Sequence, residues 1–262
     1  MDLARGAFLL GSSVAAGAIN SVAGGGTLLS FPAAMAAGLS PVVANASNAV
    51  ALMPGSLAAA WSYRAFLGDK LRLALWLALP ATAGAVLGAM LLRVTRPSVF
   101  EATVPWLILG ATLVMLLQQL GSRRAGVPAP LVPPQAGHAR RRLVLVTFFQ
   151  FLVGIYGGYF GGAMGIIMLA YLALIGGMEI HQMNAIKNLL AGLVNGVASV
   201  YFVARGMVDA RAAALMTAGA IAGGLVGARI ARRIQPRVVR WVVIAIGLGL
   251  AAIFALRGFG KS

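Results

Sequence analysis

Apolar runs of about twenty residues recur along the whole chain, and short polar or basic segments separate them. The clearest runs are Leu71 to Leu92, Val99 to Leu120, Ala212 to Ala228 and Val238 to Leu256, and they hold few charged residues. A helix needs about 20 apolar residues to cross the hydrocarbon core of a bilayer. The pattern therefore predicts an all-α polytopic membrane protein.

The two halves of the sequence resemble each other at an offset of about 137 to 140 residues. Asn48 aligns with Asn188, and Asp69 aligns with Asp209. Glycines of two Gly-rich segments align as well, with Gly17, Gly24 and Gly25 falling on Gly154, Gly161 and Gly162. This internal repeat predicts three parts: a first repeat at 1–120, a basic Pro-rich linker at 121–142 and a second repeat at 143–262.

Each repeat divides into the same series of apolar pieces, two short ones around a Gly-rich break and three longer ones. We expect a Gly-broken helix pair followed by three transmembrane helices. The pieces lie at 6–23, 27–39, 41–64, 71–92 and 98–120, and again at 143–158, 162–176, 183–204, 211–230 and 237–257. Ser40 and Pro41 suit the start of a helix, as an N-cap followed by proline at the first helical position.

The basic residues favour an inverted relation between the repeats. If each broken pair returns to its own side, 13 arginines and lysines lie on one side, in 64–72, 121–142 and 229–240, against 7 on the other. Parallel repeats give the same totals, so the positive-inside rule does not decide by counting. We prefer inversion because it places both five-arginine clusters in the cytoplasm and both termini outside.

Composition and charge support a membrane protein. Of the 262 residues, 60% are hydrophobic and only 10% are charged, and the mean hydropathy is +0.91. The formal net charge is +16, but the arginines flank apolar segments. Such an arrangement orients membrane proteins and contacts anionic lipid heads, so we expect a lipid bilayer as partner and no nucleic acid.

The chain offers little to an enzyme. It has no cysteine, which excludes disulfides, thiolate catalysis and thiolate metal sites. No histidine or pair of carboxylates lies in the middle of an apolar piece, so we predict no catalytic residues, no metal and no cofactor. His181, two residues after Glu179, could act in a gate or sense protons, although we favour the interpretation that both belong to a solvated loop.

The two Gly-rich breaks are the first candidates for a binding site. "AGGGT" at 23–27, which ends in Thr27, and "FGGAMG" at 160–165 occupy equivalent places, and each opens a helix. Paired broken helices in transporters direct their N-terminal N–H groups at anionic substrates. Small residues also permit close helix packing, and we assign that simpler role to Gly84, Gly88, Gly223 and Gly227.

A buried positive charge is the second candidate. Asn184, Lys187 and Asn188 lie at i, i+3 and i+4, so they share one face of a helix. An ammonium away from water costs roughly 2.5 to 3.5 kcal/mol on insertion scales, so it normally faces a cavity or a partner. The alternative is that Lys187 snorkels to the membrane surface. Asn45 and Asn48 form the corresponding amide pair of the first repeat.

These segments together resemble the TauE/SafE family of sulfite-exporter-like membrane proteins over nearly the whole chain. The resemblance is carried by the first glycine break, "ANASN" at 44–48, "YGGYFGG" at 156–162 and "NAIKN" at 184–188. It implies a small sulfur-containing anion, such as sulfite, sulfoacetate or a related organosulfur anion, as substrate. The matching residues are Gly24, Gly25, Gly26, Asn45, Ser47 and Asn48 in the first repeat and Gly161, Gly162, Asn184, Lys187 and Asn188 in the second. The chain departs from the family pattern at Ala163 and Met164, where relatives often continue the glycine run.

The sequence thus predicts a multi-pass secondary transporter of the bacterial inner (plasma) membrane that exports a small anion through a site between the repeats. Export of one negative charge gains about 2.3 kcal/mol per 100 mV, so no coupling ion is needed in principle. Proton- or sodium-coupled import is the alternative, and a structural subunit without transport is a third. Substrate identity, coupling, direction and a homo-oligomeric state stay open.

Overall fold

The computed structural model describes residues 2–124, 136–175 and 177–230, together with 241, 244–246 and 248–249. All regular structure in these ranges is helical. The helices are α1 (Leu3–Val22), α2 (Thr27–Ala36), α3 (Pro41–Ser62), α4 (Leu71–Val94), α5 (Pro97–Arg124), α6 (Ala136–Tyr159), α7 (Met164–Ile175), α8 (Ile180–Ala204) and α9 (Ala210–Ile230), with two short 3₁₀ turns at Arg64–Phe66 and Gly68–Lys70. Most of the apolar piece predicted at 237–257 and the middle of the predicted linker lie outside the described residues.

Helix starts follow local capping chemistry. Asp2 accepts a hydrogen bond from the backbone N–H of Arg5 at 2.9 Å, which satisfies one free donor of α1. α3 begins at Pro41 after Ser40, as predicted, although the Ser40 side chain makes no capping bond. Glu179 and Gln182 form a reciprocal capping box at the start of α8.

Helix length separates spanning helices from half-helices. Within the described residues, five helical segments are long and apolar enough to cross a membrane: Pro41–Ser62, Gly68–Val94, Pro97–Leu117, Ile180–Ala204 and Ala210–Arg229. α2 and α7 have 10 and 12 residues. At about 1.5 Å per residue they reach roughly half of a hydrocarbon core of ~30 Å. Each is therefore a half-helix that follows a break.

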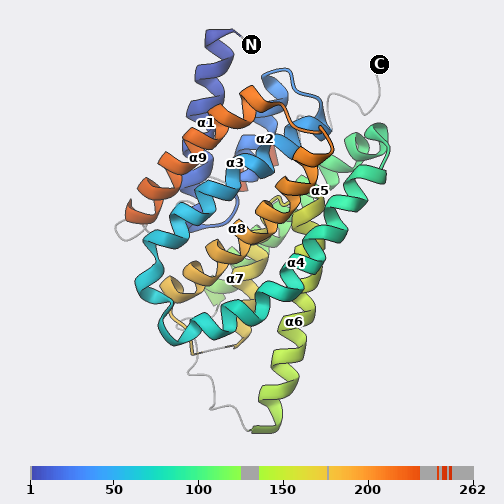
Figure 1. The fold of residues 1–262 in the computed structure, drawn as a ribbon. Coiled ribbons are helices and arrows are strands. Elements are labelled where there is room, and N and C mark those ends of the chain that lie inside the picture. The colour runs from blue at the N-terminus through green and yellow to red at the C-terminus, as the bar shows by residue number, and fades with distance from the viewer. Residues whose placement is uncertain are drawn as a thin grey trace.

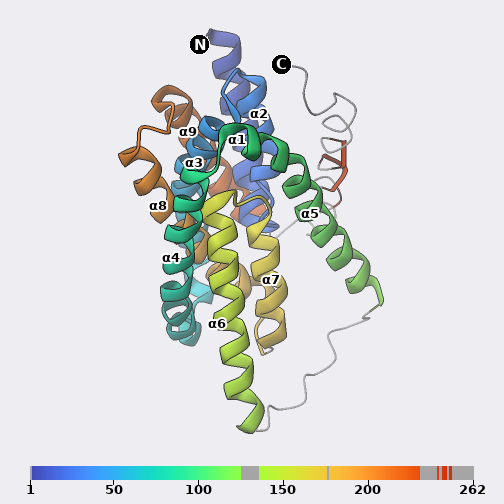
Figure 2. The ribbon, with the colours of Figure 1, turned by 90° about the vertical axis from the view of Figure 1, so that its right-hand side faces the viewer.

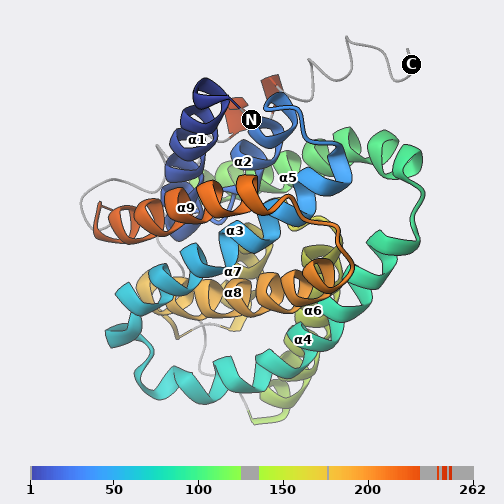
Figure 3. The ribbon, with the colours of Figure 1, turned by 45° about the horizontal axis from the view of Figure 1, so that its top comes forward.

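The helices pack mainly across the linker (Figure 1). The most extensive helix contacts join α1 to α9 and α4 to α6, and α3 packs on both α8 and α9. In Figure 3, α9, α3, α8 and α4 follow one another as neighbouring rows, with α1 beside α9 and α6 beside α4. Each of these four principal contacts joins a helix before the linker to a helix after it.

Glycines allow the closest of these contacts. A Cβ atom built on Gly223 of α9 would lie 2.0 Å from the carbonyl oxygen of Val14, and one on Gly88 of α4 would lie 2.0 Å from that of Ile155. Only glycine fits at such separations, so backbones touch directly, as in small-xxx-small packing of membrane helices. The packing role predicted for Gly88 and Gly223 is confirmed.

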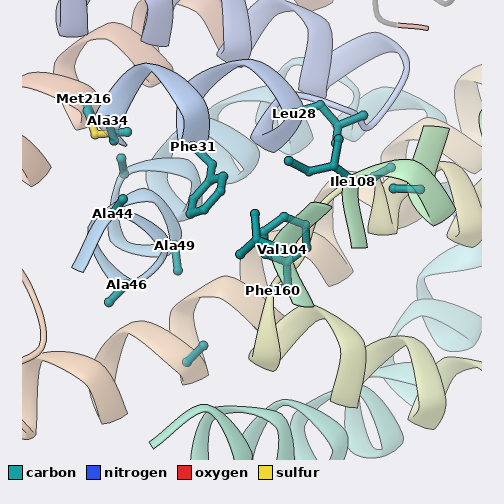
Figure 4. Close-up of a cluster of buried hydrophobic side chains, with 14 of the residues drawn as sticks. Leu28, Phe31, Ala34, Ala44, Ala46, Ala49, Val104, Ile108, Phe160 and Met216 are labelled. Atoms are coloured by element: carbon teal, nitrogen blue, oxygen red, sulfur yellow. The ribbon is translucent and has the colours of Figure 1, made fainter. Parts of the chain in front are cut away.

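An aromatic cluster joins the two breaks. Phe31 of α2 meets Phe160, which lies between α6 and α7, edge to face with ring centroids 5.3 Å apart. Leu28, Val104 and Ile108 surround this pair (Figure 4), and all five side chains are buried. Burial of this apolar surface holds α2 and the second break against α5.

Candidate functional site

The two breaks touch each other inside the molecule. Gly24 adopts φ +83°, a conformation that favours glycine. A Cβ atom at Gly24 would lie 2.6 Å from the Cα of Gly165, and one at Gly165 would lie 2.7 Å from the Cα of Gly24. The backbone of the first break therefore packs directly on the first turn of α7.

The end of α1 leaves carbonyl groups for side-chain donors. The N–H groups of Ala23 and Gly24 both bond to the carbonyl of Ile19, at 2.8 and 3.3 Å. Gly24 thus bypasses the carbonyl of Asn20, its partner in a continued helix. The carbonyls of Asn20 and Ser21 instead receive donors from α8.

Lys187 supplies the first of these donors. Its Nζ donates to the carbonyl of Asn20 at 2.8 Å and to that of Ser21 at 3.1 Å. The side chain is only 1% exposed, so it does not snorkel to a surface. Its Cδ would lie 3.1 Å from a Cβ placed on Gly165. The ammonium therefore sits at the negative end of the α1 dipole, and its stem runs beside the start of α7.

Asn188 supplies the second donor. Its Nδ2 donates to the carbonyl of Ser21 at 3.1 Å, while its Oδ1 is buried without a hydrogen-bond partner. The side chain of Asn20 donates in turn to Ser56 of α3 at 3.1 Å. These bonds tie the end of α1 to both α3 and α8.

Helix α6 ends at the second break as α1 ends at the first, but the side chain that donates to its last turn is neutral. The N–H groups of Phe160 and Gly161 both bond to the carbonyl of Tyr156, at 2.9 and 3.0 Å. The donor from the packed helix is here a neutral amide, because Asn45 of α3 donates to the carbonyl of Tyr159 at 3.0 Å. The hydroxyl of Tyr156 donates to Gly162 at 2.6 Å and fixes the loop.

The other predicted residues have separate partners. Asn48 accepts a hydrogen bond of 2.5 Å from the hydroxyl of Ser30 in α2. Ser47 lies away from the breaks, because it accepts from the backbone N–H of Asp209 at the start of α9. Asn184 is buried, and its Oδ1 has no hydrogen-bond partner. The structure thus brings Gly24, Lys187 and Asn188 to one point and gives Ser47 a different contact.

All predicted site residues are closed off from solvent. Every one of them is buried: Gly24, Gly25, Gly26, Thr27, Asn45, Ser47, Asn48, Gly161, Gly162, Asn184, Lys187 and Asn188. Cavities of about 600 Å³ beside α9 and about 680 Å³ between α4 and α6 are lined by other, mostly apolar residues. Neither of these two cavities is lined by a predicted site residue.

Three site residues were absent from the sequence prediction. Asn20 and Ser21 act through backbone carbonyls, and Gly165 acts through the absence of a side chain. Asn20 alone carried a usable signal, as an amide in an apolar piece. Among the described residues, no three histidine, cysteine, aspartate or glutamate side chains cluster closely enough to hold a metal ion.

Comparison with known proteins identifies similar sequences. The family model described as "Sulfite exporter TauE/SafE" matches residues 9–254. A probable membrane transporter protein ORF9 from Sinorhizobium sp is 29% identical over 94% of this chain and 90% of its own length. The probable membrane transporter protein YfcA of Escherichia coli K12 is 27% identical over 90% and 84%, and one from Haemophilus influenzae is 25% identical over 78% and 76%. No solved structure matches the chain.

Proposed function

The chain belongs to the sulfite exporter TauE/SafE family, its similar relatives are named as probable membrane transporter proteins, and from this premise we propose that it exports a small anion. The proposed substrate is sulfite, sulfoacetate or a related organosulfur anion. The proposed binding site lies at the junction of the two breaks. The protein itself is an integral, multi-pass membrane protein and not an enzyme.

The single observation that carries this proposal is the burial of Lys187 at the junction. A fully buried ammonium at membrane depth is costly, and in transporters such groups face substrate or ion pathways. The stem of Lys187 passes beside the first turn of α7, since its Cδ would lie 3.1 Å from a Cβ built on Gly165. The ammonium attracts an anion, and an anion bound beside it would neutralise the buried positive charge of Lys187.

Two helix N-termini add to the attraction. α2 begins at Thr27 and α7 at Met164, each directly after a break. The N–H groups of Leu28 and Leu29 bond to carbonyls of the first break, and that of Met164 bonds to Gly161 in the second. Each N-terminus therefore offers an anion chiefly the positive end of its helix dipole. A small oxyanion suits both features. The buried amides of Asn184 and Asn188 would replace part of its hydration.

We further propose that the two halves, 1–120 and 143–262, are inverted copies that exchange their packing partners. The same helix order supports this: a broken pair, then long helices. α1 ends with Gly24 bonded to Ile19, and α6 ends with Gly161 bonded to Tyr156, both at an offset of 137 residues. In Figure 2, α1 begins at the top of the view and α6 at the bottom. An anion between the halves would then be exposed to alternate sides as they rock.

The test is the thermal stability of the purified protein in sulfite, sulfate, sulfoacetate, taurine and unrelated anions. A ligand that binds only the folded state raises the melting temperature by mass action. We expect a sulfur anion to raise it for the native chain and for Lys70→Met, and not for Lys187→Met. Lys70→Met is the matched control because it removes the same charge from a partly exposed side chain paired with Asp69.

Transport in vesicles then tests direction. We expect uptake of the stabilising anion into inside-out vesicles without a sodium or proton gradient. Equal stabilisation of Lys187→Met would place the anion elsewhere and overturn the assigned site. Transport only with an imposed cation gradient would favour the coupled importer instead.

A further inference from the structure

The end of α1 has the chemistry of a cation site. The carbonyl oxygens of Asn20 and Ser21 stand at the negative end of a helix dipole, inside the protein and beside a break. In transporters with broken helices, unwound carbonyls and half-helix C-termini coordinate sodium. Here both oxygens receive the ammonium of Lys187, at 2.8 and 3.1 Å.

A third oxygen lies in the same cluster. Asn188 Oδ1 is completely buried and has no hydrogen-bond partner, although the Nδ2 of the same amide donates to Ser21. A turn of the amide would point this oxygen at the carbonyl of Ser21 and so at a cation bound there. Carbonyl and amide oxygens without a carboxylate suit a monovalent ion better than a divalent one.

We infer that this oxygen cluster is a sodium-type cation site that the protein fills with its own lysine. The tethered ammonium takes the place that a coupling ion would occupy, so the positive charge stays in the protein through the cycle. The inference deepens the proposed anion transport and rests on it for its functional meaning. Anion transport by this chain then needs no sodium.

The second break provides an internal comparison. α6 ends with the same bonding pattern as α1, but its carbonyl at Tyr159 receives the neutral amide of Asn45. The filled cation site is therefore a property of the first break, where the carbonyls of Asn20 and Ser21 converge on one ammonium.

The test removes the tethered charge and supplies a free one, without any anionic substrate besides chloride. Melting temperatures of the purified native chain, Lys187→Ala and Lys70→Ala are measured at constant ionic strength in sodium, potassium, choline or ethylammonium chloride. We expect the melting temperature of Lys187→Ala to be lowest in choline. In sodium or ethylammonium, at least half of the difference from the native chain should be restored. For the native chain and for Lys70→Ala, the melting temperature of each protein should not differ among the four salts.

Each other outcome overturns the inference. If Lys187→Ala melts identically in every salt, the oxygens do not bind a free cation. If sodium stabilises the native chain over choline, the lysine does not fill the site. If Lys187→Ala is unfolded in choline, the protein is extracted in sodium or ethylammonium instead. Folded protein in either salt supports the inference, and unfolded protein in both salts overturns it. Since no transported anion is used, this test can fail while anion export is confirmed, and the reverse.

Discussion

Ala163 lies in the second break and adopts a backbone conformation that is unfavourable for alanine. Its φ is +58°, in the left-handed region, and its methyl group is completely buried. The left-handed conformation costs about 1–2 kcal/mol for a residue with a Cβ, whereas loss of one buried methyl costs about 0.8 kcal/mol. We therefore expect Ala163→Gly to be neutral or to stabilise the protein by up to about 1 kcal/mol, as measured by thermal unfolding in detergent.

Ala198 provides the matched control for this prediction. It is also completely buried, but it lies inside α8 with helical backbone geometry. Ala198→Gly loses the same methyl and about 1 kcal/mol of helix propensity, so it should destabilise by roughly 2 kcal/mol. Equal losses in the two variants would show that the backbone of Ala163 carries no strain.

Asn188 offers a way to cancel the charge of Lys187 while keeping the side chain's size. Both side chains donate to the carbonyl of Ser21, so Asn188→Asp places a carboxylate beside the ammonium. An opposite charge within about 4–6 Å pairs with it strongly. We expect anion transport into inside-out vesicles to fall at least tenfold.

The control for Asn188→Asp is Asn195→Asp, in the same helix. Asn195 is also buried, and it lies about 10 Å further along α8 at ~1.5 Å per residue. It carries the cost of a buried carboxylate without the contact to Lys187. Circular dichroism reports whether each variant is folded. Similar transport losses in two folded variants would argue against a special role for position 188.

At the residue scale, sequence could identify side chains but not the backbone groups they meet. Lys187 and Asn188 stand out because charge and amides are rare in apolar helices. Their acceptors are the backbone carbonyls of Asn20 and Ser21. Every residue has such a carbonyl, so the acceptors leave no signal in the sequence. Ser47 was grouped with the site by motif, yet it meets Asp209, because neighbouring helical positions face different directions.

At the scale of elements, the contact between the breaks depends on Gly165. A Cβ there would lie 2.7 Å from the Cα of Gly24, so Gly165→Ala must push α7 away from the first break. Overpacking of this kind typically costs about 1–3 kcal/mol. We expect a lower melting temperature together with at least tenfold slower anion transport.

Gly110 in α5 is the matched control for Gly165. Among the described residues nothing lies within 4 Å of a Cβ built there. Gly110→Ala should therefore stabilise its helix by roughly 0.5–1 kcal/mol and leave transport unchanged. If Gly165→Ala behaves like Gly110→Ala, direct contact between the breaks is not needed for transport.

Helix ends could be predicted well where glycine or proline stops a helix and less well elsewhere. The piece predicted at 41–64 forms Pro41–Ser62, and that at 211–230 forms Ala210–Ile230. α5 and α6 instead continue into the predicted linker, to Arg124 and from Ala136. An apolar run reveals only the lipid-buried part of a helix, and basic residues can continue it at the membrane surface.

At the scale of the whole molecule, the sequence predicted the helices but not their partners. The small residues of α1, α4, α6 and α9 are compatible with many close helix pairs. The pairing of α1 with α9 and of α4 with α6 depends on which backbones fit together in space. The offset of 137 to 140 residues between the halves suggested which helices are equivalent. It carries no information on whether a helix packs on helices of its own half or of the other half.

The proposed inversion of the two halves predicts the sidedness of their loops, and because the sequence has no cysteine, introduced cysteines can test it. Ser40 precedes α3, Ile180 opens α8, and both are exposed. They are equivalent at an offset of 140 residues, so inverted halves place them on opposite sides of the membrane. In intact spheroplasts, a membrane-impermeant maleimide should label Ser40→Cys at once and Ile180→Cys only after permeabilisation, because inversion with cytoplasmic arginine clusters puts the start of α3 outside. Labelling of both variants from one side would exclude inversion, and the reverse pattern would keep inversion but turn the protein over in the membrane.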